Sequence, residues 1–493
     1  MSKNLMIQGT MSSAGKSLVT AGICRLLKQD GISVAPFKSQ NMALNSFITD
    51  EGLEMGRAQV VQAEAAGINP SVHMNPILLK PCSDNGSQVI VRGEAVNTMD
   101  AVAYYEFRKS LRSVVLESYR TLEEKYDTIV IEGAGSPAEI NLNEDDIVNM
   151  GMAEMVDAPV ILVADIDRGG VFAQIYGTIM LLPAHQRERN KGVIINKFRG
   201  DIDILKSGLS TIEELTGVRV IGVVPYLNVD IDDEDSITKR ESDTVKPLDI
   251  AVIQFPRISN ATDFTPLERT GCVQLRYVQR AKELGTPDLI ILPGTKSTMP
   301  DLLWMRQNGI EALIKKAAER GTPVLGVCGG YQMLGETLSD PENTELGGTM
   351  RGMGLLPVDT VFYAEKTRLQ SEGRVCDLEG IYSPISQTEL CGYQIHMGQT
   401  TSKVETKPFM QLSDGSFDGT VWQNVFGTYL HGLFDTELAS ELCRMLLEHK
   451  GIHDGVAAIM SAASFHQTQY DILADALRNN LDMDALYAII NKE

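Results

Sequence analysis

The stretch Gly9-Thr10-Met11-Ser12-Ser13-Ala14-Gly15-Lys16-Ser17 decides the fold of the first half of the chain, because it is a glycine-rich loop between two apolar segments. Residues 4–8 before it have the character of a strand, and residues 18–28 after it continue at helical spacing. In this context the backbone N–H groups of the loop and of the helix start bind phosphate oxygens. We therefore predict a nucleotide site formed by Gly9, Thr10, Gly15, Lys16 and Ser17.

The two residues that close this loop have separate expected roles. Lys16 reaches the β- and γ-phosphates of ATP, and the Ser17 hydroxyl binds Mg²⁺. The first glycine lies one residue too early for the strict phosphate-loop pattern, so the alternative is a plain Gly/Ser turn before a helix.

Short β-branched runs alternate with helical stretches along the chain, which is typical of parallel sheets covered by helices on both faces. The expected strands of the first half are residues 4–8, 33–37, 128–132, 160–165, 193–196 and 218–224. A second series is expected at residues 248–254, 289–293, 323–328, 392–396 and 427–431. The pattern predicts an α/β protein of two domains, residues 1–240 and 248–440, with C-terminal helices over residues 441–493 that close the second domain. The acidic stretch in residues 230–246 is the expected linker.

Composition excludes several classes of function. The 493 residues exceed what one hydrophobic core supports, and the net charge of -21 argues against nucleic-acid binding. The seven cysteines form no C-x-x-C pair, so neither a disulfide framework nor a thiolate zinc site is indicated. No apolar run is long enough for a membrane span, and the N-terminus lacks a secretory signal, which favours the cytoplasm. The sequence is compatible with a homo-oligomer.

Charged residues follow two expected strands of the first domain. Glu132 emerges into the glycine turn 133–137, at the sheet edge where open α/β proteins bind ligands. We expect Glu132 to bind Mg²⁺, with a turn or cap role as the alternative. Asp167 and Arg168 precede a glycine pair after another strand, where they contact substrate or phosphate, or form a salt-bridged helix start.

The second domain contains a strand, a sharp turn and a helix with Cys328 at the turn and glycines at 326, 329 and 330. This is a nucleophile elbow with sulfur in place of the serine oxygen. A thiolate nucleophile needs an imidazole to carry protons, and His431, at the end of a later strand, is the chosen base. His396 is the competing histidine, interpreted as an interface or substrate group.

The oxyanion formed during attack on an amide needs N–H donors. Gly294 lies in a glycine turn at the end of an expected strand, and Gly329 follows the nucleophile. We expect Gly294, Gly329 and Gln332 to form the oxyanion and glutamine site.

The lengthened phosphate loop resembles that of dethiobiotin synthetase and of the amide synthetases of cobalamin biosynthesis. This resemblance implies that Lys38, in the segment 36–42, points to the same phosphates, although a solvated lysine is equally consistent with the residues alone. It also implies that Asn196 reads the adenine ring, or else caps a turn, and that Glu54 corresponds loosely to a second metal-binding acid.

Residues 248–440 resemble the class I glutamine amidotransferases. Their usual His-x-Glu pattern is absent, because residue 433 is Leu, so the resemblance implies a Cys328–His431 dyad without an orienting acid. This departure is itself typical of the domains joined to cobalamin-pathway synthetases.

Over essentially its full length the chain resembles the cobyric acid synthase family, through the segments 38–42, 132–137 and 165–173 and the Cys328 elbow. The resemblance implies ATP- and glutamine-dependent amidation of the b, d, e and g carboxylates of adenosylcobyrinic acid a,c-diamide, a corrinoid. The alternatives are a cobyrinic acid a,c-diamide synthase, a positioning ATPase with a deviant phosphate loop, and a glutaminase-like binding module with an inactive Cys–His pair.

Overall fold

A computed structural model describes residues 2–82, 86–141, 145–231, 246–453 and 462–493. The chain divides into two compact units, which are described separately. The first contains Met1–Ala43, Glu54–Glu234 and His466–Glu493, and the second contains Leu44–Leu53 and Asp235–Phe465. Most of the expected linker, residues 232–245, lies outside the described residues.

The first unit is built on a six-stranded parallel sheet with the order β12-β11-β10-β1-β9-β2. Its central strands, β1 (Lys3–Gly9), β9 (Thr128–Glu132) and β10 (Val160–Asp165), are almost entirely buried. Such strands are apolar on both faces because helices cover both sides of a parallel sheet. The predicted strands of this domain are therefore confirmed, and the ends of β1 and β9 place the phosphate loop beside Glu132.

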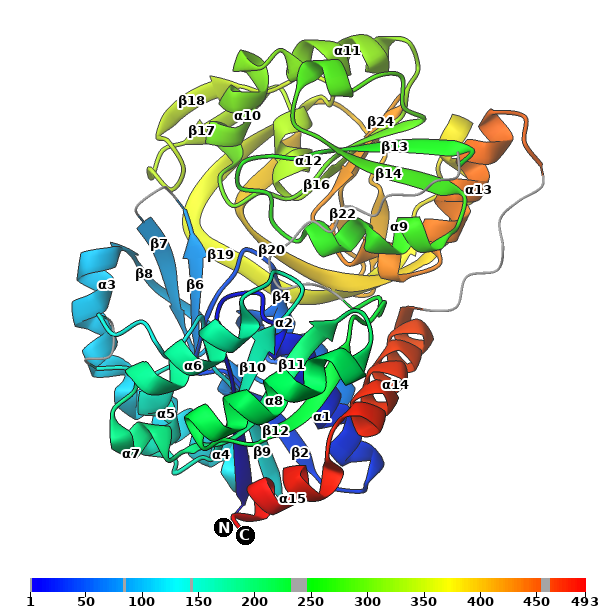
Figure 1. Cartoon of the computed structure of the whole chain (residues 1–493). Helices are drawn as coiled ribbons and strands as arrows, with labels where there is room; N and C mark the ends of the chain where they lie inside the picture. The colour runs from blue at the N-terminus through cyan, green and yellow to red at the C-terminus, as the bar shows by residue number, and fades with distance from the viewer. Residues whose placement is uncertain (1, 83–85, 142–144, 232–245, 454–461) are drawn as a thin grey trace. The chain divides into compact units, whose positions relative to one another are not determined.

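The first unit also contains helices and a smaller sheet beside this one (Figure 1). A four-stranded sheet, β3-β6-β7-β8, is a second element of this unit that the alternation of strands and helices did not predict. The elements are α1 (Lys16–Gln29), β2 (Val34–Phe37), β3 (Gln40–Met42), β5 (Glu54–Gly56), α2 (Arg57–Ala66), β6 (Ile77–Pro81), β7 (Gly86–Val91), β8 (Glu94–Asp100), α3 (Ala101–Arg108), α4 (Arg112–Glu123), α5 (Met150–Met155), α6 (Val171–Leu181), α7 (Ala184–Arg187), β11 (Asn190–Phe198), α8 (Ile202–Thr216) and β12 (Val220–Pro225).

The last two helices, α14 (Ala462–Asn480) and α15 (Met483–Asn491), pack on the first unit from His466 onward. Leu473 and Leu477 of α14 join the core cluster of α1 and the sheet, and the Asp482 N–H donates to the Ile221 carbonyl (2.7 Å). Figure 1 shows the two chain ends side by side, and Lys3 Nζ donates to Asn491 Oδ1 (2.7 Å). The expectation that these helices close the second domain is wrong.

The reason for this error is that helical spacing identifies an apolar stripe but not the surface that covers it. Of the expected C-terminal helices, α13 (Leu438–His449) does pack in the core of the second unit.

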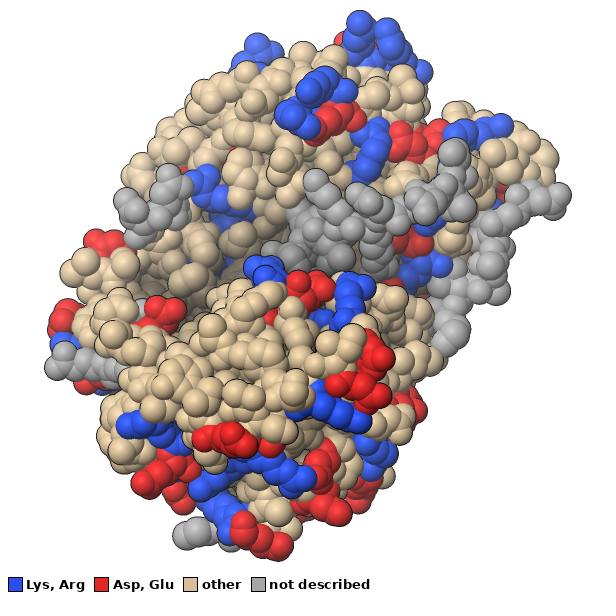
Figure 2. All heavy atoms as spheres, viewed as in Figure 1, with Lys and Arg blue, Asp and Glu red and all other residues tan. Residues whose placement is uncertain are grey.

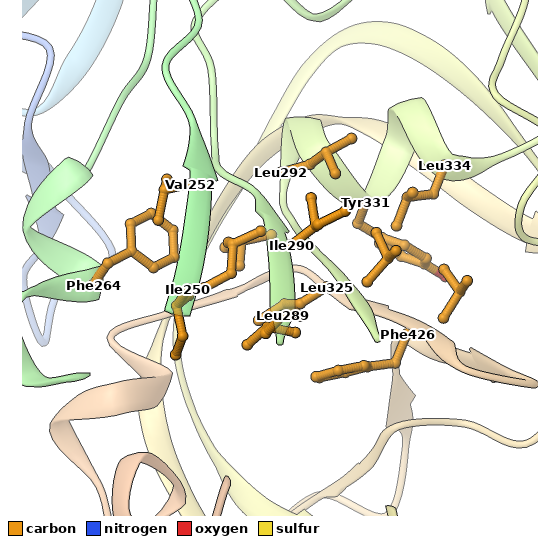
Figure 3. Close-up of a cluster of buried hydrophobic side chains, with 14 of the residues drawn as sticks. Ile250, Val252, Phe264, Leu289, Ile290, Leu292, Leu325, Tyr331, Leu334 and Phe426 are labelled. Atoms are coloured by element: carbon orange, nitrogen blue, oxygen red, sulfur yellow. The ribbon is translucent and has the colours of Figure 1, made fainter. Parts of the chain in front are cut away.

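The second unit has a sheet with the order β14-β13-β15-β16-β24-β23, parallel except for the β23–β24 pair. Figure 3 shows its core, to which Ile250 and Val252 of β13, Ile290 of β15, Leu325 of β16 and Phe426 of β24 all contribute. All five side chains are buried to within 1% exposure, so this sheet is a rigid support for the residues at its ends.

A second sheet of this unit contains the long antiparallel pair β19 (Val358–Val375) and β20 (Glu389–Ser402), which the sequence did not predict as such. The other elements are β4 (Ser46–Ile48), β13 (Leu248–Ile253), η3 (Ala261–Phe264), α9 (Thr265–Arg269), β14 (Val273–Val278), β15 (Leu289–Leu292), α10 (Thr298–Gln307), α11 (Ile310–Glu319), β16 (Val324–Val327), α12 (Gly329–Leu334), β17 (Thr337–Asp340), β18 (Gly348–Arg351), η5 (Gly380–Ile385), β21 (Met410–Leu412), β22 (Phe417–Asp418), β23 (Thr420–Trp422), β24 (Val425–Thr428), β25 (Leu430–His431) and η6 (Leu433–Asp435).

The face in Figure 2 carries acidic and basic side chains interspersed with uncharged ones. This mixed surface differs from the basic stripe that proteins use to bind nucleic-acid backbones. Within the described residues, every helix is too short or too polar to cross a lipid bilayer.

Candidate active sites

The phosphate loop of the first unit joins β1 to α1. Gly15, the N-cap residue of α1, has φ 100°, and a Cβ there would lie 2.1 Å from Asn196 Nδ2, so this position requires glycine. The Lys16 side chain passes over Gly9, and its ammonium donates to the carbonyls of Met11 and Gly135 at 3.0 Å each. The lysine therefore lies inside the loop, near the end of β9.

The Glu132 carboxylate connects three side chains at this point. Ser17 Oγ and Lys38 Nζ donate to its Oε1 at 2.8 and 3.0 Å, and Gln62 Nε2 donates to Oε2 at 2.5 Å. The Lys38 and Glu132 side chains are at most 5% exposed. A buried ion pair is expensive to desolvate, so this one is weak evidence for stability. The structure thus brings together Ser17, Lys38 and Glu132, all three predicted site residues.

Glu54 is also buried, at 1% exposure, and its Oε1 accepts a hydrogen bond from Lys80 Nζ (2.9 Å). This ion pair explains why the carboxylate is tolerated there. A metal role for Glu54 stays a prediction.

Asn196 lies at the end of β11 and contacts the loop itself, because its Nδ2 donates to the Ala14 carbonyl at 3.0 Å. The next residue, Lys197, donates to the Ser13 carbonyl (2.7 Å) and to Asp165 Oδ2 (2.8 Å). These contacts fix the shape of the loop. The adenine contact predicted for Asn196 stays a prediction.

Asp167 and Arg168 follow the end of the neighbouring strand β10 (Val160–Asp165). Arg199 Nε donates to Asp167 Oδ1 (3.0 Å), and Arg168 Nε is 4.0 Å from Asp165 Oδ2. The Arg168 side chain is 61% exposed, so this ion pair contributes little to stability and the substrate role is still a prediction.

Cys328 of the second unit occupies the turn between β16 and α12. Its φ of 51° and ψ of -108° are unusual for a residue with a side chain, as at a nucleophile elbow. Its N–H donates to the Thr428 carbonyl (2.8 Å), which ties the elbow to β24, and its Sγ lies 3.5 Å from the Ile395 carbonyl oxygen. A Cβ on Gly330 would lie 1.9 Å from the Leu292 carbonyl oxygen, so the helix start packs directly on β15.

His431 is 1% exposed, and the Cys328 side chain is close enough to raise the pKa of its imidazole. On its other side, His431 Nδ1 is 2.7 Å from Asp263 Oδ2, and the Gly432 N–H donates to Asp263 Oδ1 (3.2 Å). Cys328, His431 and Asp263 therefore have the arrangement of a nucleophile, a base and an orienting acid. The expectation of a dyad without an acid is wrong.

Burial lowers the pKa of the His431 imidazole, but the Asp263 carboxylate and the Cys328 side chain outweigh it and raise the pKa to about 10. The imidazolium form is consequently favoured at neutral pH. Burial lowers the pKa of His396 to about 4, and this ring stacks on Tyr429 with its Nδ1 2.8 Å from the Gly398 carbonyl oxygen. Of the two histidines, His431 has the geometry of the base.

The turn at Gly294, which is predicted to bind the oxyanion, lies against His431 and against Gly329, the residue after Cys328. A Cβ on Gly294 would be 2.9 Å from His431 Cε1, and one on Gly329 would be 2.8 Å from Thr295 Cγ2. Gln332 is 2% exposed, accepts from Thr298 Oγ1 (2.9 Å) and donates to Tyr429 Oη (3.3 Å). These bonds fix the Gln332 side chain, and its contact with glutamine stays a prediction.

Sequence reasoning missed Asp263, Gln62 and Asn149, which hold the site residues in place. The Asn149 side chain donates to the Ala134 carbonyl (2.6 Å) and accepts from the Ala134 N–H (3.2 Å), which fixes the turn after Glu132. Asp263 lies 168 residues before His431. The available signal was its place after strand β13, at the carboxyl edge where Cys328 also lies.

Two family models match the chain. Residues 5–236 match the "CobQ/CobB/MinD/ParA nucleotide binding domain", and residues 249–439 match the "CobB/CobQ-like glutamine amidotransferase domain". A protein named cobyric acid synthase from Ruminiclostridium cellulolyticum is 53% identical, over 100% of this chain and 98% of its own. One of the same name from Lachnoclostridium phytofermentans is 53% identical over 100% of both chains.

Among solved structures, PurLQS from Thermotoga maritima aligns with 42% of this chain and 100% of its own, at 20% identity and a TM-score of 0.33. This likeness is too distant to bear on the assignment, which the full-length similarities carry.

Proposed function

Since the chain belongs to the cobyric acid synthase family, which performs glutamine-dependent amidation in cobalamin biosynthesis, we propose that it converts adenosylcobyrinic acid a,c-diamide to adenosylcobyric acid. The substrates are the corrinoid, ATP and glutamine, and the b, d, e and g carboxylates are amidated. The observation that most supports this proposal is the Cys328–His431–Asp263 arrangement in a chain that also contains a phosphate loop with a buried Ser17–Glu132 contact.

Glutamine hydrolysis takes place at Cys328. The Cys328 thiolate attacks the side-chain amide carbon, and His431 gives its proton to the departing ammonia. Water then attacks the thioester, with His431 taking its proton, and glutamate leaves. Asp263 holds the imidazole in the orientation and charge state that these transfers need, and backbone donors near Gly294 and Gly329 stabilise the oxyanion.

Amidation takes place at the phosphate loop. A corrinoid carboxylate oxygen attacks the γ-phosphorus of ATP, ADP leaves, ammonia attacks the acyl phosphate carbon, and inorganic phosphate leaves. Lys16 and Lys38 neutralise charge on the transferred phosphoryl group.

The Ser17 hydroxyl and the Glu132 carboxylate are hard oxygen donors with a 2.8 Å contact, so they fit Mg²⁺, which would neutralise phosphate charge when bound. On this proposal Lys38 shares the Glu132 carboxylate with the metal or turns to the phosphates.

The test is to incubate the protein with Mg·ATP, amide-¹⁵N glutamine and adenosylcobyrinic acid a,c-diamide, and to follow the corrinoid by mass spectrometry. We expect successive incorporation of ¹⁵N, with ATP hydrolysis that depends on the corrinoid. Cobyrinic acid offered in parallel tests the a,c-diamide synthase alternative. ATP turnover that ignores both corrinoids would overturn the assignment.

A further inference from the structure

A ten-residue segment from the first half of the sequence belongs to the second unit. Leu44–Leu53 packs there, although the residues before and after it, Met1–Ala43 and Glu54–Glu234, belong to the first unit. This inserted segment contains β4, which packs against β19 and β20. It then turns back on itself, since the Thr49 N–H donates to the Leu53 carbonyl at 2.8 Å.

Backbone hydrogen bonds and one apolar side chain hold the inserted segment in place. The Ser46 N–H donates to Asn260 Oδ1 (3.2 Å), the Ser46 carbonyl accepts from Tyr393 Oη (2.8 Å), and the Ile48 carbonyl accepts from Gln370 Nε2. Ile48 is completely buried and clusters with Tyr393 and Ile395. The segment is therefore an integral part of this unit's packing.

One residue that the segment holds, Tyr393, lies directly on the catalytic base. The Tyr393 ring stacks on the His431 imidazole with centroids 5.4 Å apart and an interplanar angle of 18°. Phe47 of the segment also meets the Tyr393 ring edge-on, with centroids 5.2 Å apart. The imidazole is thus supported by a ring that is in turn packed and hydrogen-bonded by the inserted segment.

The inserted segment also bonds Asn260, the residue before η3, which is the short helix that carries Asp263. Its carbonyl accepts from the Asp263 N–H (3.0 Å), and its φ of 53° is a left-handed conformation that costs free energy outside glycine. Its side chain offsets this cost by donating to Tyr393 Oη (2.7 Å) and accepting from Ser46. Ser46, Asn260 and Tyr393 form a closed hydrogen-bonded ring beside both His431 and Asp263.

We propose that the inserted segment is a positioning element for the glutaminase, acting through Tyr393 on His431 and through Asn260 on Asp263. This proposal rests on the proposed hydrolysis of glutamine at Cys328. Full glutaminase activity then requires ten residues that the sequence places within the nucleotide-binding half, between Lys38 and the α2 helix.

The test uses the full-length chain and two variants. Tyr393→Phe keeps the stacked ring but removes the hydroxyl that bonds Ser46 and Asn260. Asn260→Gly removes the amide but keeps a residue for which φ 53° is unstrained. The matched control is Tyr382→Phe, which removes another buried tyrosine hydroxyl of the same unit, bonded to the Asn424 carbonyl at 2.6 Å.

We expect kcat for glutamine hydrolysis to fall about tenfold or more in Tyr393→Phe and Asn260→Gly, because small displacements of catalytic groups are costly, with KM for glutamine changed far less. The alkaline limb of the pH profile should move to lower pH, since a looser His431–Asp263 contact no longer raises the pKa of the imidazole as far. In Tyr382→Phe both quantities should match the wild type, even if its melting temperature falls.

Synthesis supported by free ammonium separates this proposal from the proposed function. It should be unchanged in all three variants, and its absence in the wild type would overturn the function itself. If wild-type glutaminase is active but Tyr393→Phe and Asn260→Gly retain its kcat and pH profile, the segment is only structural and the positioning proposal is wrong. Should one of the two variants fail to fold, the other carries the same test.

Discussion

At the level of single residues, the proposed glutaminase depends on the charge of one buried imidazole, that of His431. His431 lies between the Cys328 side chain and Asp263 Oδ2, at 2.7 Å from the latter, and it is 1% exposed. In such a site a carboxylate acts more strongly than it would in water, because solvent does not screen it. Asp263 thus orients the His431 ring and also keeps that ring protonated.

We predict that Asp263→Asn reduces glutamine hydrolysis on the order of 10²-fold, because proton transfer loses its oriented base. Asp263 raises the pKa of His431, which stands at about 10, so its removal lowers that pKa and moves the alkaline limb of the pH profile to lower pH. Initial rates of glutamate release between pH 6 and 11 check this, with free ammonium supporting synthesis as before. An unshifted alkaline limb would show that Asp263 does not control the imidazole.

Glu132→Gln tests the metal site proposed for the first unit. The amide is a weaker ligand than the carboxylate, so we predict that synthesis falls on the order of 10²-fold with glutamine and with ammonium alike, and that the Mg²⁺ requirement rises. Glutamine hydrolysis should persist. The matched control is Asp471→Asn, which breaks an ion pair with Arg25. The Asp471 side chain is 47% exposed, so this variant should have the Mg²⁺ requirement of the wild type. An unaltered Mg²⁺ dependence in Glu132→Gln would assign Glu132 to turn stability alone.

The grouping of the candidate site residues in the first unit could be predicted because they are local in sequence or occur at strand ends. Lys16 and Ser17 follow from the loop, and Glu132 from a strand that ends in a glycine turn. Asp263 could not be predicted in this way, since the position where the family usually has its acid, two residues after the base, is Leu433. Only the fold brings η3 to the His431 imidazole.

At the scale of elements, α14 shows what helical periodicity leaves open. Its stripe predicts a buried face, yet the partner is the distant helix α1: Leu477 lies against Gly22, where a Cβ would be 2.4 Å from Leu477 Cδ1. Arg25 Nε and Asp471 Oδ1, at 2.7 Å, join the same two helices. The antiparallel pairing of β19 with β20 was not predicted for a related reason, because strand pairing depends on partners far along the chain.

We predict that Leu477→Ala lowers the free energy of unfolding of the first unit by about 2–5 kcal/mol, because it removes a fully buried side chain and leaves a cavity. Ile472→Ala is the matched control, since this residue of the same helix is 47% exposed and its loss should cost less than about 0.5 kcal/mol. Urea denaturation with and without nucleotide measures both. Equal, small effects would mean that α14 contributes little to the stability of this unit.

On the scale of the whole molecule, we propose that one chain carries two chemistries in two units, with hydrolysis at Cys328 supplying ammonia for amidation at the phosphate loop. Each unit's site was anticipated from its own motif. The places of the inserted segment and of helix α14 were not anticipated, because each packs in a different unit from its neighbours in sequence.

The most direct test of this central claim is corrinoid amidation by Cys328→Ala, measured by mass spectrometry with glutamine or with ammonium as the nitrogen source. We predict that the variant makes no amide from glutamine but amidates with ammonium at the wild-type rate, because the phosphate-loop site is intact. Loss of both activities together in a folded protein, or full glutamine-dependent synthesis without the thiol, would contradict it.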